Sequence, residues 1–232
     1  MRLYLSSFRL GDRPERLVEL IPPPARVAVI ANAIDAEPAD VRAEKVRQEI
    51  AWLTELGLSA DELDLRDWFP DPGRAADAKR LRDTDSGGTV DAQGLREQLI
   101  SYQGVWVRGG NVFVLRSAMA RSAADTVLHE LVASDAIVYA GYSAGPCVLA
   151  PSLRGLEMCD DPGAVAATGG ELRWDGLGLI DEAFVPHVDS PGHPETELLA
   201  RTAEFYRDTG VPHLTLRDGQ ALIVNGTHRT LL

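Results

Sequence analysis

One stretch of the chain, AIVYAGYSAGPCVLA at residues 136–150, decides how the rest is interpreted. Its first five residues form an apolar run rich in β-formers, which is typical of a buried central strand. The next five match G-x-S-x-G, and Pro146 then stands in the first turn of a helix, where its missing N–H does no harm. Such a sharp strand-to-helix turn needs glycine and exposes a serine hydroxyl at the top of a sheet. The stretch therefore predicts a nucleophile at Ser143, with the N–H of Ala144 pointing toward an oxyanion.

On both sides of this stretch, short apolar runs alternate with amphipathic segments, the pattern of a parallel sheet covered by helices. We predict an α/β fold with a mostly parallel central sheet and helices on both faces, as one domain over residues 1–232. The Pro-, Gly- and charge-rich segment 71–90 is expected to be a surface excursion. The expected strands are residues 3–6, 27–31, 63–65, 104–110, 136–140, 184–187, 213–216, 221–224 and 227–232, and the expected helices are residues 39–56, 91–101, 111–120, 123–132 and 195–208.

Composition excludes several classes of protein. The chain has 23 Lys and Arg against 35 Asp and Glu, a net charge of −12, whereas binding to nucleic acid needs clustered Lys and Arg. Two cysteines cannot build a disulfide framework, and no Cys/His spacing predicts a metal site. No run of 18 apolar residues predicts a membrane span. We expect a cytoplasmic protein without cofactor or metal requirement, which binds neither nucleic acid nor membrane; a homo-oligomer is compatible with the sequence.

A serine nucleophile needs a base, and the chain has five histidines. His187 follows the short apolar run FVP and precedes a loop, so it is expected at the C-terminal end of a strand, where α/β active sites assemble. His193 is the rival, although a loop histidine between glycine and proline more often contacts substrate or solvent. His129, His213 and His228 fall within helix or strand patterns and are expected to be structural. We therefore favour His187 as the base.

The carboxylate that would orient this base is not determined by the residues alone. It must accept the Nδ1–H of His187 so that Nε2 faces Ser143. Acid-rich loops are usually solvated, so none of the carboxylates between these two residues stands out. They are Glu157, Asp160, Asp161, Glu171, Asp175, Asp181 and Glu182.

A second donor for the oxyanion is expected from another strand that ends in glycine. Gly109-Gly110-Asn111 ends the strand GVWV and opens a helix with exposed N–H groups, which suits an anion. The alternative is a tight turn without a ligand.

Four stretches together resemble the peptidase E family of serine peptidases, which includes α-aspartyl dipeptidase and, more distantly, cyanophycinase. The order of elements extends the resemblance over nearly the whole chain. It implies an α/β sandwich related to class I glutamine amidotransferases, with serine where those enzymes have cysteine, and a serine exopeptidase acting on short peptides. The stretches are GVWVRGGNVFVLR (104–116), YAGYSAGPCVLAPSLRG (139–155), VPHVDSPGHPET (185–196) and GQALIVNG (219–226).

The resemblance also implies roles for individual residues. Members carry an acid about fifteen residues after the nucleophile, and Glu157 matches this position if one residue is deleted, with Asp160 and Asp161 as reserves. The remaining implied roles are Ser143 as nucleophile, His187 as base, Gly110 and Ala144 as oxyanion donors, and Asn111, His193 and Glu197 as substrate contacts.

One position departs from the family pattern. The dipeptidases carry a G-E-T-R-like string whose arginine is expected to pair with the substrate's aspartate, and here Glu197 stands in the arginine's place. A carboxylate would repel an aspartyl side chain, so strict Asp-X specificity is not expected. Substitutes for the missing cation are Arg108, Arg116, Arg154 and Arg173.

The expected mechanism is peptide hydrolysis through an acyl-enzyme with a Ser-His-Glu/Asp triad. Two alternatives remain. An α/β-hydrolase esterase shares G-x-S-x-G, although it usually has more residues between its serine and histidine and an HGGG-type loop. A non-catalytic amidotransferase-like binding domain would keep the turn without the chemistry.

Overall fold

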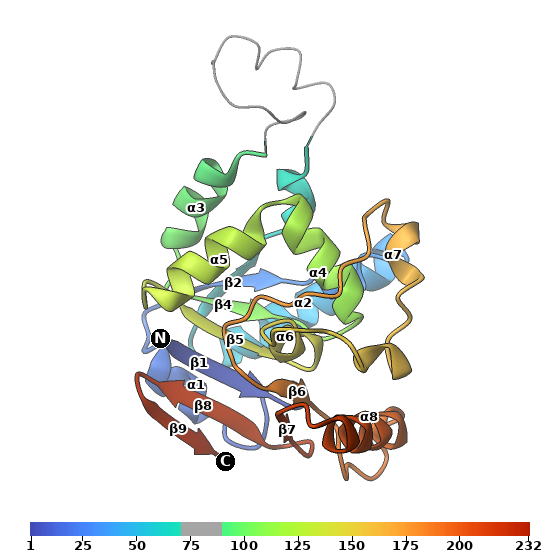
Figure 1. Cartoon of the computed structure of the whole chain (residues 1–232). Helices are drawn as coiled ribbons and strands as arrows, with labels where there is room; N and C mark the ends of the chain where they lie inside the picture. The colour runs from blue at the N-terminus through green and yellow to red at the C-terminus, as the bar shows by residue number, and fades with distance from the viewer. Residues whose placement is uncertain (71–89) are drawn as a thin grey trace.

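Seven strands make the central sheet of the computed structural model, which describes residues 1–70 and 90–232 (Figure 1). Their order is β3-β2-β4-β5-β1-β8-β9. The first five in this order run parallel, whereas β8 and β9 close the edge as an antiparallel hairpin. The expected mostly parallel α/β sheet is therefore present. The strands are β1 (Arg2–Ser6), β2 (Arg26–Ile30), β3 (Ser59–Glu62), β4 (Gly104–Val107), β5 (Val138–Tyr142), β8 (Ala221–Asn225) and β9 (His228–Leu231).

Helices cover both faces of this sheet because successive strand residues point to opposite sides. In β1, Leu3 and Leu5 pack in one hydrophobic cluster, and Tyr4 packs in the other. The first cluster contains buried residues of α3, α4 and α5, and the second contains those of α1 and α2. The helices are α1 (Glu15–Leu20), α2 (Ala39–Glu55), α3 (Ala92–Ile100), α4 (Val112–Arg121) and α5 (Ala124–Ala133).

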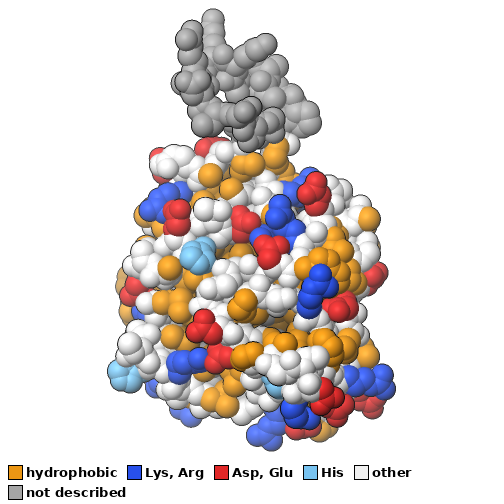
Figure 2. Space-filling view, in the orientation of Figure 1, with side chains coloured by type: hydrophobic (Ala, Val, Ile, Leu, Met, Phe, Trp, Pro, Cys, Tyr) orange, Lys and Arg blue, Asp and Glu red, His pale blue; other side chains and the backbone are white. Residues whose placement is uncertain are grey.

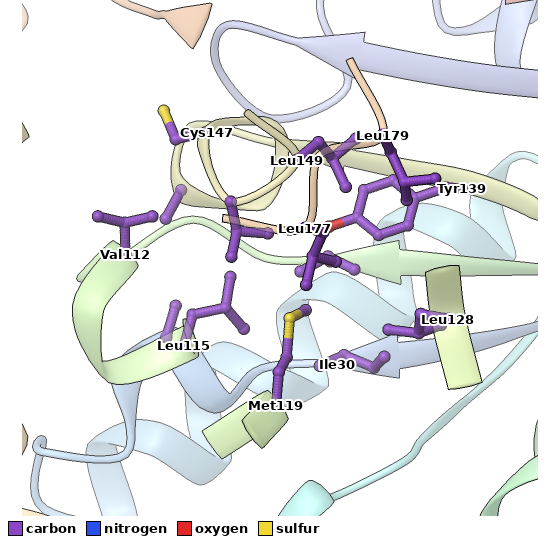
Figure 3. Packing of buried hydrophobic residues seen from close by; sticks show 14 of the residues in the cluster. Ile30, Val112, Leu115, Met119, Leu128, Tyr139, Cys147, Leu149, Leu177 and Leu179 are labelled. Carbon is purple, nitrogen blue, oxygen red and sulfur yellow. The ribbon is translucent and has the colours of Figure 1, made fainter. Parts of the chain in front are cut away.

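The side chains of α4 and α5 pack directly on the sheet. Figure 3 shows Leu115, Met119 and Leu128 beside Ile30 and Tyr139, and all five side chains are buried. Apolar side chains therefore fill the space between these helices and the strands.

A second, two-stranded sheet lies beside the first, formed by β6 (Ala183–Val185) and β7 (His213–Thr215) in parallel. Helix α8 (Thr196–Thr209) connects the two strands and lies next to them in Figure 1. The strand predicted before His187 therefore exists, but it belongs to this small sheet and not to the central one.

Two further predictions differ from the structure, and a third falls largely on residues that the structure does not describe. Residues 63–65 are not the third strand: β3 ends at Glu62, and Leu65 begins the short 3-10 helix η2 (Leu65–Trp68), whose N-cap Asp64 accepts a hydrogen bond from the N–H of Arg66. The helix after the serine is only α6 (Ala144–Cys147). Most of the predicted surface excursion, residues 71–89, lies outside the described residues.

The surface agrees with the charge balance of the chain. On the face shown in Figure 2, basic and acidic side chains are interspersed and no extended basic stripe is seen. Among the helices described, none combines the length and apolar character needed to cross a membrane.

The packing predicts a large cost for truncating Leu128, which lies in α5 with no exposed surface. Leu128→Ala should lower the free energy of unfolding by about 2–5 kcal/mol, because it removes buried methyl groups and leaves a cavity. Leu172→Ala is the matched control, since Leu172 is 42% exposed and should change stability by less than about 0.5 kcal/mol. Urea denaturation measures both, and equal losses would contradict this packing.

Candidate active site

The turn that carries Ser143 is shaped by the close approach of a neighbouring strand. A Cβ atom on Gly141 or on Gly145 would overlap the carbonyl oxygen of Val107, the last residue of β4. Glycine is therefore required on both sides of the serine, and the two glycines of G-x-S-x-G have a packing reason here.

Ser143 itself adopts an unusual backbone conformation, with φ 53° and ψ −114°. A non-glycine residue with positive φ persists only when its surroundings hold it there. The N–H of Ser143 donates to the carbonyl oxygen of Ser6 at 3.3 Å, and the buried Tyr139 hydroxyl donates to the carbonyl oxygen of Gly145 at 2.7 Å. The first bond comes from the end of β1 and the second from a side chain of β5, the strand that leads into the turn. A strained serine held between a strand and a helix in this way is the arrangement of a nucleophile elbow.

A cleft of about 610 Å³ opens at this turn. Ser143 lines it together with His187, His193 and Gly110, so four of the predicted site residues meet in one place. The remaining lining residues are Phe8, Arg9, Ile34, Glu37, Lys45, Gln48, Glu49, Trp52, Arg108, Gly109, Tyr142, Pro194 and Glu195.

The partner of His187 is Asp218. The Nδ1 atom of His187 lies 2.6 Å from Oδ1 of Asp218, and the histidine is almost fully buried. The hydroxyl of Ser7 donates to the same carboxylate oxygen at 3.0 Å and accepts the backbone N–H of His187 at 2.9 Å. A carboxylate on Nδ1 favours the tautomer with the proton on that nitrogen, which leaves the Nε2 lone pair free.

The backbone brings Asp218 to this position by continuing the small sheet. The N–H of Leu216 donates to the carbonyl oxygen of Val185, and the N–H of Val188 donates to that of Leu216, each at 3.0 Å. Two residues later, the N–H of Asp218 donates to the hydroxyl of Ser190 at 2.8 Å. The segment between β7 and β8 therefore runs along the loop that carries His187. Bonds between these two segments fix His187 and Asp218 beside each other.

Burial lowers the pKa of His187 below its ordinary value, because a buried imidazolium loses hydration. The hydrogen bond to Asp218 acts in the opposite direction but does not cancel this effect. The imidazole is therefore held in its neutral, proton-accepting form around neutral pH.

The prediction that Glu157 orients the histidine is wrong in its geometry. Glu157 is exposed, and its carboxylate accepts the N–H of Gly155 at 2.5 Å, two residues away. The reserves bond elsewhere as well: Asp160 accepts the N–H of Val112 at 2.7 Å, and Asp161 accepts a local N–H in its own loop. Glu157 and Asp161 thus bond within their own loop and Asp160 bonds to the start of α4, so none of the three bonds to His187.

The glycines at the end of β4 lie against the serine. A Cβ on Gly109 would come within 2.9 Å of the Cβ of Ser143. Gly110 has φ +144°, and a Cβ there would meet the carbonyl oxygen of Ala33 at 2.7 Å, so this position also requires glycine. Gly109 thus lies against Ser143, and Gly110 of the predicted oxyanion pair lines the same cleft, whereas Ala144 follows Ser143 in sequence and does not line it.

Asn111 does not line the cleft, in contrast to its predicted role as a substrate contact. Its Oδ1 accepts the N–H groups of Phe113 and Val114 at 3.0 Å each, which caps the N-terminus of α4. Its Nδ2 donates to the carbonyl oxygen of Asp161 at 2.8 Å. The side chain thus begins the helix and holds the neighbouring loop.

The loop before α8 contributes His193 and Glu195 to the cleft, whereas Glu197 lies exposed in the first turn of the helix and does not line it. Glu197 therefore does not lie where a substrate in this cleft would contact it, in contrast to its predicted role. Its charge accordingly does not bear on which substrate side chain the cleft accepts. The rings of His193 and His187 are stacked, with centroids 3.7 Å apart. His187, His193 and Glu195 also offer ligand atoms within 4.8 Å of one another, as a metal ion would require.

A buried carboxylate, Glu49 of α2, links the C-terminal ends of β4 and β5. Its oxygens accept the indole N–H of Trp106 at 2.8 Å and the hydroxyl of Tyr142 at 2.7 Å, and Nε of Arg108 lies 3.1 Å away. Tyr142 precedes Ser143, and Arg108 precedes the paired glycines. Burial raises the pKa of Glu49, although these partners oppose the shift.

Four arginines were predicted as substitutes for the family's arginine that this chain lacks, and they fall into two groups. Only Arg108 lines the cleft, whereas Arg116 pairs with Asp125 and Asp175, and Arg154 stacks over Trp174. The remaining candidate, Arg173, lines a different hollow.

Arg9 is a cleft cation that the sequence did not single out. Its guanidinium lies 4.7 Å from the ring centroid of Phe8 and 5.0 Å from that of Trp52. Among the described residues, no carboxylate lies within ion-pair distance of it. The cation–π contacts therefore hold Arg9 at the rim with its charge available to a ligand.

The sequence did not indicate Asp218, because it follows His187 and does not lie between the serine and the histidine, where the candidate acids were expected. Its local signal, Asp-Gly before an apolar strand, is that of a turn. Only the pairing of residues 185–188 with residue 216 brings it to His187.

The chain was compared with known proteins. The sequence model described as peptidase family S51 matches residues 86–232, more than half of the chain. Peptidase E of Streptomyces coelicolor is 30% identical over 165 residues, which are 66% of this chain and 63% of that protein. The chain thus matches slightly less than two thirds of this relative's length.

Two solved structures are similar in fold over the whole chain. A crystal structure from Listeria monocytogenes whose description names peptidase E has a TM-score of 0.73 at 21% identity and is covered to 97%. The structure of a peptidase from an acI-B1 Actinobacterium has a TM-score of 0.65 at 17% identity and is covered to 86%.

The network around Glu49 predicts a large loss of stability for Glu49→Ala, about 3–5 kcal/mol in the free energy of unfolding. The substitution leaves the charge of Arg108 without its carboxylate partner and two buried donors, on Trp106 and Tyr142, without an acceptor. Glu55→Ala, on the exposed face of the same helix, is the control and should change stability by less than about 0.5 kcal/mol. If urea denaturation gave the two variants the same stability, the network would not be a stabilising one.

Proposed function

Because this chain belongs to peptidase family S51, we propose that it is a serine peptidase that hydrolyses short peptides through an acyl-enzyme. One observation supports the proposal above all others. Ser143, held in a strained turn, shares a cleft with a buried histidine whose Nδ1 is bonded to a carboxylate. This is the arrangement that makes a serine hydroxyl nucleophilic.

In the proposed mechanism, Nε2 of His187 accepts the hydroxyl proton of Ser143 as Oγ attacks the carbonyl carbon of the scissile bond. The C–N bond then breaks, and His187 gives the proton to the leaving amine. Water attacks the resulting ester, again with His187 as the base, and releases the carboxylic acid and free Ser143. Asp218 stabilises the imidazolium that forms in each step.

The negative charge of the tetrahedral intermediate would be stabilised by the N–H groups of Gly110 and Ala144. Gly110 follows β4 and Ala144 begins α6, so the two donors come from adjacent parallel strands. Donors that are already fixed in place cost no reorganisation in the transition state. Their positions support acyl transfer.

The size and lining of the cleft support a short peptide as substrate. It holds aromatic side chains at Phe8 and Trp52 and charges of both signs, of which Lys45 is already paired with Glu37. We propose that the enzyme acts as an exopeptidase, because a cleft of about 610 Å³ suits a few residues of peptide. The single-domain organisation expected from the sequence is kept in this proposal.

The proposal predicts that Ser143→Ala lowers kcat/KM for peptide hydrolysis by about 10⁶-fold, because the variant lacks the nucleophile. Release of amino groups from a panel of dipeptides and longer peptides, blocked and unblocked at each end, measures this and reports which terminus is trimmed. Acyl esters in the same panel test the esterase alternative. Undiminished peptide cleavage by the variant would refute the mechanism.

The identity of the orienting acid is tested by a matched pair of substitutions. Asp218→Asn should lower kcat by about 10⁴-fold, since an amide no longer selects the productive tautomer of His187. Glu157→Gln, which changes an exposed carboxylate in the same chemical way, should leave kcat unchanged. The reverse ranking would return the role to Glu157.

The lowered pKa of His187 predicts the acidic limb of the pH profile. The base must be neutral, so kcat/KM should be retained as the pH falls to 6.5, the ordinary pKa of histidine, and be lost only below it. The measurement is kcat/KM of the wild-type protein against pH. A midpoint above 6.5 would contradict the burial effect on His187.

A further inference from the structure

Three side chains of the cleft lie close together, although the proposed peptidase mechanism uses only one of them, His187. His187, His193 and Glu195 each offer one ligand atom, and these atoms lie within 4.8 Å of one another. Two imidazoles and one carboxylate are a ligand set that zinc uses in proteins, with a fourth position left open. The set therefore has the composition of a transition-metal site.

His187 is prepared to act as the fixed ligand. Metal-bound histidines almost always donate the N–H of their second nitrogen to a carboxylate or carbonyl oxygen, which fixes the ring and makes the free nitrogen more basic. Asp218 is such a partner for Nδ1 at 2.6 Å, and the ring is buried. The arrangement that orients a base thus also orients a metal ligand.

The other two ligands can adjust. His193 and Glu195 are half-buried and lie in the loop that precedes α8. Around a tetrahedral zinc ion, ligand atoms lie roughly 3.3 Å apart, given metal–ligand distances of about 2.0–2.2 Å. The backbone of this loop is held by bonds such as that from the N–H of His193 to the carbonyl oxygen of Ser190 at 3.0 Å. Among the described hydrogen bonds, the His193 ring is held only by a long one, from the N–H of Glu195 to its Nδ1 at 3.3 Å. Closure needs small side-chain rotations, including a tilt of His193 out of its stack with His187.

The charge around the group favours a cation. Cys159, Asp160 and Glu195 form a second group of ligand atoms within 4.8 Å of one another, so Glu195 belongs to both. Two of the cleft cations are already neutralised, Lys45 by Glu37 and Arg108 by Glu49. Two carboxylates, Asp218 and Glu195, therefore lie next to the histidines, against one cleft cation without an ion pair among the described residues, Arg9.

We propose that His187, His193 and Glu195 form an inhibitory site for zinc. The inhibition rests on the proposed function, because zinc on Nε2 of His187 removes the lone pair that would accept the proton of Ser143. Binding itself rests only on the three side chains. Nitrogen ligands select zinc over magnesium, which prefers an all-oxygen shell.

The binding experiment uses the full chain with Ser143→Ala, freed of metal, and titrates it with Zn²⁺ and separately with Mg²⁺ by calorimetry. We expect one Zn²⁺ per chain and no Mg²⁺. His193→Ala and Glu195→Gln, each added to this background, should weaken Zn²⁺ binding at least about tenfold, because loss of a ligand should cost no less than loss of its supporting partner. Circular dichroism checks that each variant is folded.

The chain offers matched controls for both substitutions. His228→Ala removes an exposed histidine in β9, and Glu197→Gln removes an exposed carboxylate two residues after Glu195. Both controls should bind Zn²⁺ as the Ser143→Ala protein does. Equal binding by all four variants, or no binding by the parent, would overturn the site.

The inhibition experiment measures peptide hydrolysis by the wild-type protein with increasing Zn²⁺ and after addition of a chelator. We expect loss of activity that the chelator reverses, and at least about tenfold more Zn²⁺ needed for the same loss in Glu195→Gln. Full activity with the site occupied would overturn the inhibition. A protein that binds Zn²⁺ as expected but cleaves no peptide would refute the peptidase proposal and leave the metal site standing.

Discussion

The close approach of β4 to the turn after β5 is the constraint on which the rest of the site depends. The carbonyl oxygen of Val107 lies where a Cβ of Gly141 or Gly145 would be, so no other residue fits on either side of Ser143. The same approach sets Gly109 against the serine. The parallel pairing of β4 and β5, with Val107 opposite Gly141, is therefore also what brings Ser143 and the paired glycines after β4 to one edge of the sheet.

The second half of the site is built on different elements. His187 and Asp218 come from loops of the small β6-β7 sheet, and Ser7, which follows β1, bonds to both. This hydroxyl links the small sheet to the central one at the cleft. Cys147 of α6 adds a bond from its Sγ to the carbonyl oxygen of Phe184 in β6, so the position of the histidine relative to the serine depends on both sheets.

How much of this was predictable differs from residue to residue. The turn at Ser143 and the position of His187 were predicted, because an apolar run followed by turn residues is a pattern of a few neighbouring residues. Asn111 was predicted in the right place with the wrong role, since an asparagine before a helix is a cap as readily as a ligand contact. The prediction that Glu157 orients the histidine was wrong, because its carboxylate accepts the N–H of Gly155 in its own loop instead. The family was recognised correctly from four short stretches, and a match to peptidase family S51 confirms it.

By itself, the sequence determined the α/β fold and predicted the turn at Ser143 and the position of His187 after a short strand, because apolar periodicity and glycine placement act over a few residues. Only the tertiary structure decided which carboxylate meets the histidine and which charges face the cleft. Asp218 lies 31 residues after His187, and Glu49 lies 93 residues before Tyr142. Contacts over such separations depend on strand order and on the pairing of loops, neither of which leaves a pattern in neighbouring residues.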